Sequence, residues 1–242
     1  MSEENSAYAW GAHYKLPPHG NMMVYGDEDF VQRGTALFAT IEAAIKEYRS
    51  DRPIEKMNIL DFGCGVGRVA LPFFYKYKRP NRCVDISLTA IRYLQEVIPE
   101  AKPRLSRKAP PLEFYADGFF DVIYSISVFT HLEPAKADLW LREIHRLLKP
   151  GGLALLSTSS HTQLEWHHKD PRRAELWKDV SVERFEREGI IFRGTYHKGM
   201  DAMYGCAIHM PWWIKQHWSA LFDVKESQVR AGLQDLNILI KR

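Results

Sequence analysis

The chain has 242 residues, of which 45% are hydrophobic and 26% are charged, as expected for one folded domain with a substantial core. Its formal net charge of +3 is too small to indicate a nucleic-acid partner by itself. Residues 1–8 lack a signal-peptide pattern, no run of 18 apolar residues occurs, and the three cysteines have no CxxC spacing. We therefore predict a cytoplasmic protein with Cys64, Cys83 and Cys206 reduced and buried.

The N-terminal part divides into two patterns. Residues 8–25 are rich in aromatic residues, proline, glycine and methionine and have neither a helix nor a strand period. Such a segment must pack on another part of the fold. Residues 27–49 place apolar side chains at helical spacing behind an acidic start, which predicts an amphipathic helix.

Strands and helices then alternate along the chain. The pattern predicts strands at 57–61, 82–85, 121–127 and 153–158, and helices at 67–77, 88–97 and 135–148. This alternation indicates a parallel sheet with helices on both faces and all strand C-termini along one edge.

The alternation breaks at residues 161–209, a polar and histidine-rich stretch that we interpret as an insertion with one helix at 171–187. A tryptophan-rich helix at 211–222 follows, with most of its tryptophans expected in the core. Two strands near 222–229 and 233–241 are joined too tightly for a helical crossover, so they should pair antiparallel.

A glycine-rich turn, ILDFGCGVGR at 59–68, joins the first predicted strand to the first helix. Gly63, Gly65 and Gly67 allow a tight turn and close approach to a ligand, and the helix starting near Gly67 directs N–H groups at it. Asp61 precedes the first glycine by two residues, unlike the G-x-G-x-x-G turn of dinucleotide folds. A pyrophosphate disfavours such a carboxylate, whereas a sulfonium ligand with an ammonium group is favoured by it.

Asp85 ends the second predicted strand, 24 residues after Asp61. A carboxylate at this position can accept two hydrogen bonds from a ribose diol, and Ile86 could pack against an adenine face. The alternative is that Asp85 caps the next helix, although Ser87 is the better cap for a helix from Leu88 onward.

Four more motifs follow in order: PPLEF at 110–114, GFFDVIY at 118–124, SVFTHL at 127–132 and LLKPGG at 147–152. With the glycine-rich turn, they resemble the class I S-adenosylmethionine-dependent methyltransferases over about residues 55–160. The segment 234–242 is similar to the last strand of that fold. The resemblance implies an α/β fold with a doubly wound, mostly parallel seven-stranded sheet, an antiparallel last strand, and S-adenosylmethionine as cofactor.

The resemblance also implies roles for single residues, with Asp61 and the three glycines around the methionine moiety and Asp85 on the ribose. Many relatives carry Asp or Asn near the third strand, just before the PPLEF motif, to recognise the adenine amino group. Here that stretch is RLSRKA at 104–109, in which either Ser106 or a backbone group could take this role. The predicted cofactor-binding residues are Asp61, Gly63, Cys64, Gly65, Gly67, Arg68, Asp85, Ile86, Ser106 and Ser127.

Two histidines are candidates for catalysis. His131 follows the fourth strand at the ligand-binding edge and could act as a general base, or it could order its loop and cap the next helix. His161 lies in the insertion. We predict no metal site, because the adjacent His167 and His168 cannot both face one ion. The basic cluster of Lys76, Lys78, Arg79 and Arg82 is interpreted as solvated surface.

The sequence therefore predicts methyl transfer to an oxygen or nitrogen of a small molecule, sugar or natural-product intermediate, with neither a membrane nor a nucleic acid as partner. A non-catalytic S-adenosylmethionine-binding module and an RNA or protein methyltransferase remain alternatives. The expected parts are 1–50 as lid and helix, 51–160 as cofactor core, 161–209 as substrate cap and 210–242 as the end of the sheet. Tyr14, Met22, Met23 and Tyr25 are candidates for the lid.

Overall fold

The computed structural model describes residues 9–18, 27–78, 82–194, 205–231 and 234–242. The chain forms two compact units, one made of Met1–Lys108 with Phe119–Ser125 and the other of Ala109–Gly118 with Ile126–Arg242.

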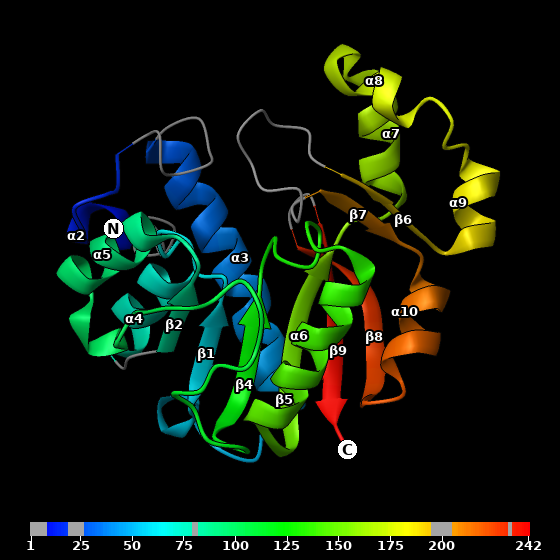
Figure 1. Cartoon of the computed structure of the whole chain (residues 1–242). Coiled ribbons are helices and arrows are strands. Elements are labelled where there is room, and N and C mark those ends of the chain that lie inside the picture. Colours follow the sequence, from blue (N-terminus) through cyan, green and yellow to red (C-terminus); the bar gives the residue numbers. More distant parts are fainter. Residues whose placement is uncertain (1–8, 19–26, 79–81, 195–204, 232–233) are drawn as a thin grey trace. The chain divides into compact units, whose positions relative to one another are not determined.

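A seven-stranded sheet has the hydrogen-bonded strand order β3-β2-β1-β4-β5-β9-β8. Figure 1 labels these strands, except β3. In the first unit, β1 pairs in parallel with both β2 and β4, and β2 with β3. In the second unit, β9 runs antiparallel to both β5 and β8. The strands are β1 (Ile59–Phe62), β2 (Arg82–Asp85), β3 (Arg104–Leu105), β4 (Phe120–Ser125), β5 (Leu148–Thr158), β8 (Phe222–Ala231) and β9 (Gln234–Lys241). The predicted mixed sheet is confirmed.

Among its described residues, the first unit has four α-helices, α2 (Ala9–His13), α3 (Asp27–Tyr48), α4 (Ala70–Tyr77) and α5 (Leu88–Val97), with short 3₁₀ helices η2 (Ile54–Lys56) and η3 (Pro99–Ala101). All four helices contribute to one buried cluster, for example through Trp10, Phe30, Leu71 and Leu94. The predicted α3 and α5 are confirmed. The short helix α2 lies in a stretch for which no helix was predicted, so that interpretation was wrong.

Close packing at Gly34 joins α3 to the glycine-rich turn. A Cβ at Gly34 would lie 2.5 Å from the carbonyl oxygen of Arg68 and 2.8 Å from the Trp10 ring. The Trp10 indole is fixed there because its Nε1–H donates a hydrogen bond to Thr35 Oγ1 over 2.9 Å. There is thus no room at this position for a side chain.

We expect Gly34→Ala to lower the free energy of unfolding by about 1–3 kcal/mol, because a backbone oxygen cannot rotate away from the added methyl group. Helix propensity alone would make alanine more stable than glycine by about 1 kcal/mol. A decrease in the free energy of unfolding would therefore indicate the close contact. Urea unfolding measures it. Gly194→Ala is the control, since a Cβ there meets no described atom within 4 Å; a stabilised Gly34→Ala would contradict the packing argument.

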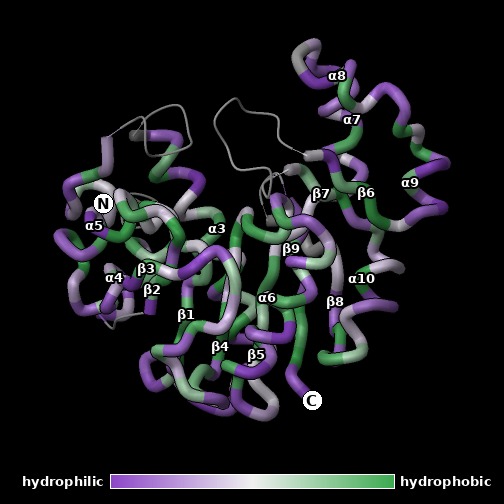
Figure 2. The backbone as a smooth tube through the Cα atoms, in the orientation of Figure 1, coloured by the Kyte–Doolittle hydropathy of each residue, from purple (hydrophilic) through white to green (hydrophobic). Residues whose placement is uncertain are grey.

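The second unit contains five α-helices among its described residues: α6 (Pro134–Leu147), α7 (His161–Lys169), α8 (Pro171–Trp177), α9 (Val182–Glu188) and α10 (Pro211–Trp218). It also has a two-stranded antiparallel sheet of β6 (Ile190–Arg193) and β7 (Cys206–His209). Leu164, Trp177, Phe185 and Ile208 help to form the core of this helix and hairpin region. The central residues of β9 are buried, and Figure 2 shows green, hydrophobic stretches along this strand between hydrophilic residues.

Three predictions about the second unit were wrong. The single helix at 171–187 is in fact two helices, because the Ser181 hydroxyl accepts the Arg184 N–H and starts α9 anew. The strand predicted from 153 begins at Leu148. Of the three tryptophans of α10, Trp218 is buried while Trp212 is 42% exposed.

The three cysteines are free and buried, as predicted. Among the residues that the structure describes, no helix combines the length and the apolar composition needed to span a bilayer.

Candidate functional site

The glycine-rich turn is built from backbone geometry that side chains disfavour. Gly63, Gly65 and Gly67 have φ values of 74°, 51° and 80°. A Cβ on Gly67 would lie 2.7 Å from Leu94 Cδ2, so this glycine permits close packing of α5. A Cβ on Gly65 would meet no described atom within 4 Å. The turn therefore leaves open space beside Gly65. Because it continues through residue 69, α4 begins at Ala70, three residues later than predicted.

The Asp85 carboxylate fixes this turn to the end of β2. Its Oδ2 accepts the Gly65 N–H and its Oδ1 accepts the Ser87 N–H, each over 2.7 Å. The cap of α5 is Ser87, whose hydroxyl accepts the Ala90 N–H. Burial raises the pKa of Asp85, against the effect of the backbone donors. Each carboxylate oxygen has a second lone pair with which it can accept a hydroxyl group.

Asp61 is nearly buried at the end of β1, with 3% of its surface exposed. Its Oδ2 accepts a hydrogen bond of 3.0 Å from the hydroxyl of Tyr124, a residue not among those predicted for the site. Burial raises the pKa of Asp61 to about 8, and the charge of Asp85 adds to this effect, while Tyr124 and Arg68 oppose it. The Asp61 carboxyl group is thus sensitive to nearby charge.

The other predicted residues of the turn are close to the same groups. Arg68 is half-buried, and burial lowers its pKa while the charge of Asp61 opposes that change. Cys64 is buried beside Cys83, and burial raises the pKa of its thiol well above the usual value. Cys64 is therefore a packing residue and no nucleophile at neutral pH.

Apolar side chains are exposed where β2 and β3 end. Ile86 is 39% exposed and Leu105 is 48% exposed. The Ser106 N–H donates a hydrogen bond of 2.9 Å to the carbonyl oxygen of Asp85. Ser106 thus lies beside Asp85, and the structure brings the first-unit members of the predicted set to one end of the parallel strands.

Ser127, His131 and His161 belong to the second unit. Ser127 has a φ of 63° and is held by two hydrogen bonds of 2.8 Å, from its N–H to Ser157 Oγ and from Gln234 Nε2 to its hydroxyl. A polar network of side chains from three strand ends therefore fixes this strained residue.

His131 is anchored to the backbone at Gly205. Its Nδ1 lies 2.8 Å from the Gly205 carbonyl oxygen, and its own carbonyl accepts the Gly205 N–H over 3.0 Å. A carbonyl only accepts, so Nδ1 carries a proton and Nε2 is the acceptor of the neutral ring. These contacts are consistent with a role in ordering its loop, but His131 does not cap α6, whose cap residue is Glu133.

His161 is the first residue of α7 and is partly exposed. Its Nε2 lies 4.0 Å from Glu186 Oε1, and its ring contacts the edge of Phe185 at 5.1 Å. Both contacts come from α9. His161 is therefore engaged with the helices that follow β5.

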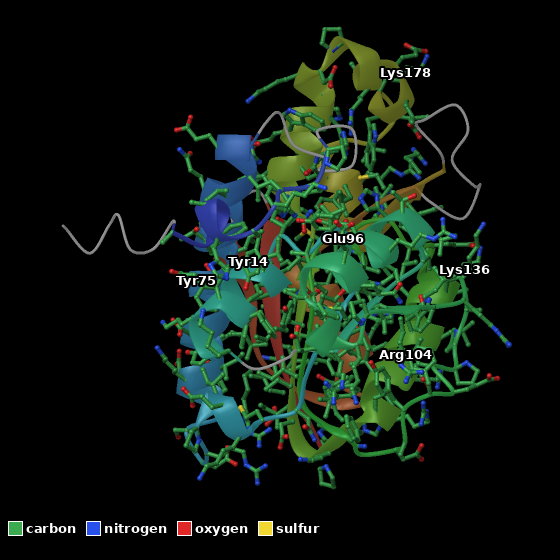
Figure 3. The ribbon with its side chains drawn as sticks, turned by 90° about the vertical axis from the view of Figure 1, so that its left-hand side faces the viewer. Tyr14, Tyr75, Glu96, Arg104, Lys136 and Lys178 are labelled. Carbon is green, nitrogen blue, oxygen red and sulfur yellow. The ribbon has the colours of Figure 1, made fainter. Side chains whose placement is uncertain are left out.

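The lid candidates are described only in part. Tyr14 packs against the same core cluster as Tyr75, and Figure 3 labels both side chains. Burial, with the charge of Glu100, raises the pKa of Tyr14 to about 12. Met22, Met23 and Tyr25 lie outside the described residues. Over the described ranges, no three His, Cys, Asp or Glu side chains are grouped to hold a metal ion.

Residues 33–201, more than half of the chain, match the methyltransferase domain family, and the chain belongs to this family. This membership confirms the methyltransferase resemblance of the sequence. A ubiquinone biosynthesis O-methyltransferase of Chelativorans sp. is 31% identical over 122 residues, 48% of this chain and 46% of that protein. The tRNA N(3)-cytidine methyltransferase METTL2 of Mus musculus is 31% identical over 116 residues, 40% of this chain and 28% of that protein. The chain thus spans less than half the length of these curated relatives.

Solved structures share the fold. Burkholderia thailandensis 1,6-didemethyltoxoflavin-N1-methyltransferase, solved with bound 1,6-didemethyltoxoflavin and S-adenosylhomocysteine, aligns with a TM-score of 0.56 at 18% identity, covering 100% of this chain and 90% of that one. Streptomyces venezuelae DesVI aligns with a TM-score of 0.60 at 13% identity, covering 94% and 100%. At these identities the likeness shows the fold alone.

Proposed function

We propose that the chain is an S-adenosylmethionine-dependent methyltransferase that transfers a methyl group to an oxygen or nitrogen of a small molecule, sugar or natural-product intermediate. The observation that carries the proposal is the link from Asp85 to the Gly65 N–H. This hydrogen bond connects Asp85, whose carboxylate is suited to bind a ribose diol, with the glycine-rich turn, which has open space beside Gly65.

The donor set fits this cofactor. Asp85 would hold the ribose hydroxyls, and the exposed Ile86 and Leu105 would cover the adenine. Gly63, Gly65 and Gly67 would approach the methionine moiety, whose cationic end suits the carboxylate of Asp61. Ser106 would then contact the adenine through its side chain, because its N–H is already bonded to the carbonyl oxygen of Asp85.

Catalysis by this chain requires orientation, exclusion of water and removal of one proton. S-adenosylmethionine, when bound, supplies an electrophilic methyl group. The residues of this chain would orient the acceptor atom, exclude water and take up the acceptor proton. His131 is the first candidate for the base that takes up this proton because its Nε2 is the acceptor of the neutral ring; His161 is the second.

The named relatives support a small-molecule substrate and also indicate RNA as the alternative. A ubiquinone biosynthesis O-methyltransferase and a toxoflavin-precursor N-methyltransferase, as their names state, act on small molecules. The match to a tRNA cytidine methyltransferase favours RNA as the second candidate. The small net charge of +3 favours the small molecule. Residues 161–209 are proposed as the substrate cap, residues 1–50 as lid and helix, and the cytoplasm as the location.

Calorimetric titration of the full chain with S-adenosylmethionine, S-adenosylhomocysteine and NAD tests the cofactor. We expect micromolar-range binding of the first two, on the order of −8 kcal/mol, and none of NAD. Methyl transfer from labelled cofactor to small-molecule extracts or to total tRNA then separates the two substrate classes. Selective binding of NAD, or no nucleoside binding, would refute the proposed function.

A further inference from the structure

Tyr124 and Asp61 face each other across β4 and β1. They are paired in the strand register, and the Tyr124 hydroxyl donates to Asp61 Oδ2 over 3.0 Å. Tyr124 is fully buried. Its ring stacks on Phe73 of α4, with centroids 6.2 Å apart and planes at 15°. The hydroxyl therefore has a fixed position against the carboxyl group.

The surroundings of Asp61 make its charge depend on this hydroxyl. Burial alone favours the neutral carboxylic acid, and the negative Asp85 of β2 acts in the same direction, whereas Tyr124 and Arg68 favour the carboxylate. The titratable and charged groups around Asp61 and Arg68 are Tyr124 of β4, Asp85 of β2, Arg68 and Cys64 of the glycine-rich turn, and Asp29 and Arg33 of α3.

We propose that Tyr124 is a positioning residue whose hydrogen bond favours the ionised form of Asp61, the form that attracts the sulfonium and ammonium groups of bound S-adenosylmethionine. The inference rests on the proposed function. A neutral donor suits this role, because it stabilises an anion without cancelling the negative charge that a cationic ligand needs. The carboxylate then favours the cofactor over its product, because the product keeps the ammonium group but its thioether sulfur carries no charge.

The Tyr124→Phe variant tests the role because it keeps the ring and its stacking on Phe73 and removes only the donor. We expect its Kd for S-adenosylmethionine to be about tenfold above that of the wild type at pH 7, the value of a lost hydrogen bond to a charged group. The two Kd values should agree within about twofold at pH 9, where the carboxylic acid ionises in both proteins. The ratio of the two cancels the titration of the ligand's own amine.

Two controls separate positioning from structural damage. Tyr77→Phe removes a hydroxyl that also donates to a carboxylate, that of Glu42 on α3, and it should leave cofactor affinity unchanged. In an Asp61→Asn background, Tyr124→Phe should have no further effect on the Kd, because no charge remains to be held. Thermal melts verify that the variants fold.

The outcomes are distinct. A Kd ratio that is the same at pH 7 and pH 9, or equal for S-adenosylmethionine and S-adenosylhomocysteine, would overturn the role of Tyr124 alone. If Tyr124→Phe does not fold, Asp61→Asn carries the test: a preference for S-adenosylmethionine as strong as in the wild type would overturn the inference. Failure of wild type and Tyr77→Phe to bind either nucleoside would overturn the proposed function as well.

Discussion

Replacing Asp85 with alanine should weaken the binding of S-adenosylmethionine by at least about 100-fold, because two hydrogen bonds to a charged acceptor would be lost with the ribose. The same change releases the Gly65 and Ser87 N–H groups that the carboxylate holds at 2.7 Å. The first effect removes contacts with the cofactor and the second loosens the turn that would hold it. Neither effect removes apolar packing. Isothermal calorimetry at pH 7.5 measures the loss.

Two further variants show whether the loss of affinity in Asp85→Ala comes from the missing carboxylate or from lower stability. Asp85→Asn retains one acceptor oxygen, so its affinity should lie between those of alanine and wild type. Asp121→Asn is the matched control, since Asp121 is also buried in the first unit but accepts the Asn58 N–H and pairs with Arg52. It should lower stability and leave the Kd unchanged. Wild-type affinity in Asp85→Ala would remove Asp85 from the cofactor site.

Acid should destabilise the second unit through its buried histidines. Burial lowers the pKa of His209 to about 3 and that of His167 to about 4, from an ordinary value of 6.5. His209 packs near Trp213 and Trp218, and His167 stacks on Trp177 with its Nε2 3.1 Å from Cys206 Sγ. Their contribution to the free energy of unfolding is complete above pH 6.5. It is lost as the pH falls below 6.5 towards the folded-state pKa values, because in this range only the unfolded chain takes up the protons.

A His209→Gln variant isolates this effect. Its free energy of unfolding relative to wild type should rise by about 3 kcal/mol between pH 7 and pH 4, at about 1.4 kcal/mol for each unit of pKa difference. Asp61 acts with the opposite sign, since its raised pKa favours the folded state at lower pH, but it is common to both proteins and cancels. Denaturant unfolding across this pH range is the measurement. A difference independent of pH would mean that folded His209 accepts a proton.

Local signals made the first unit largely predictable. Ser87 and Pro99 bracket α5, whose bounds match the prediction. The glycine-rich turn and Asp85 could be identified because each needs only its own sequence neighbourhood. The open side of Gly65 and its bond to Asp85 are consistent with that interpretation.

Non-local information was needed for the rest. Tyr124 becomes a partner of Asp61 only through the register of two strands, and the residues of the motif around it carry no sign of that pairing. Helix α9 had local signals, Ser181 as its cap and Gly189 at its end, but they were read as part of one longer helix. The roles of His131 and His161 stay predictions, because their contacts with Gly205 and Glu186 fit structural and catalytic roles alike.

The position of β9 has a consequence for biosynthesis. It follows every other described strand in sequence, yet it pairs with both β5 and β8, for example Leu153 with Ile240. The second unit therefore has a high contact order and should complete its folding late, after synthesis of its final strand. Before β9 has been synthesised, the edge of β5 that pairs with it is exposed on the nascent polypeptide. An unpaired edge of a hydrophobic strand is prone to aggregation, and molecular chaperones shield such edges.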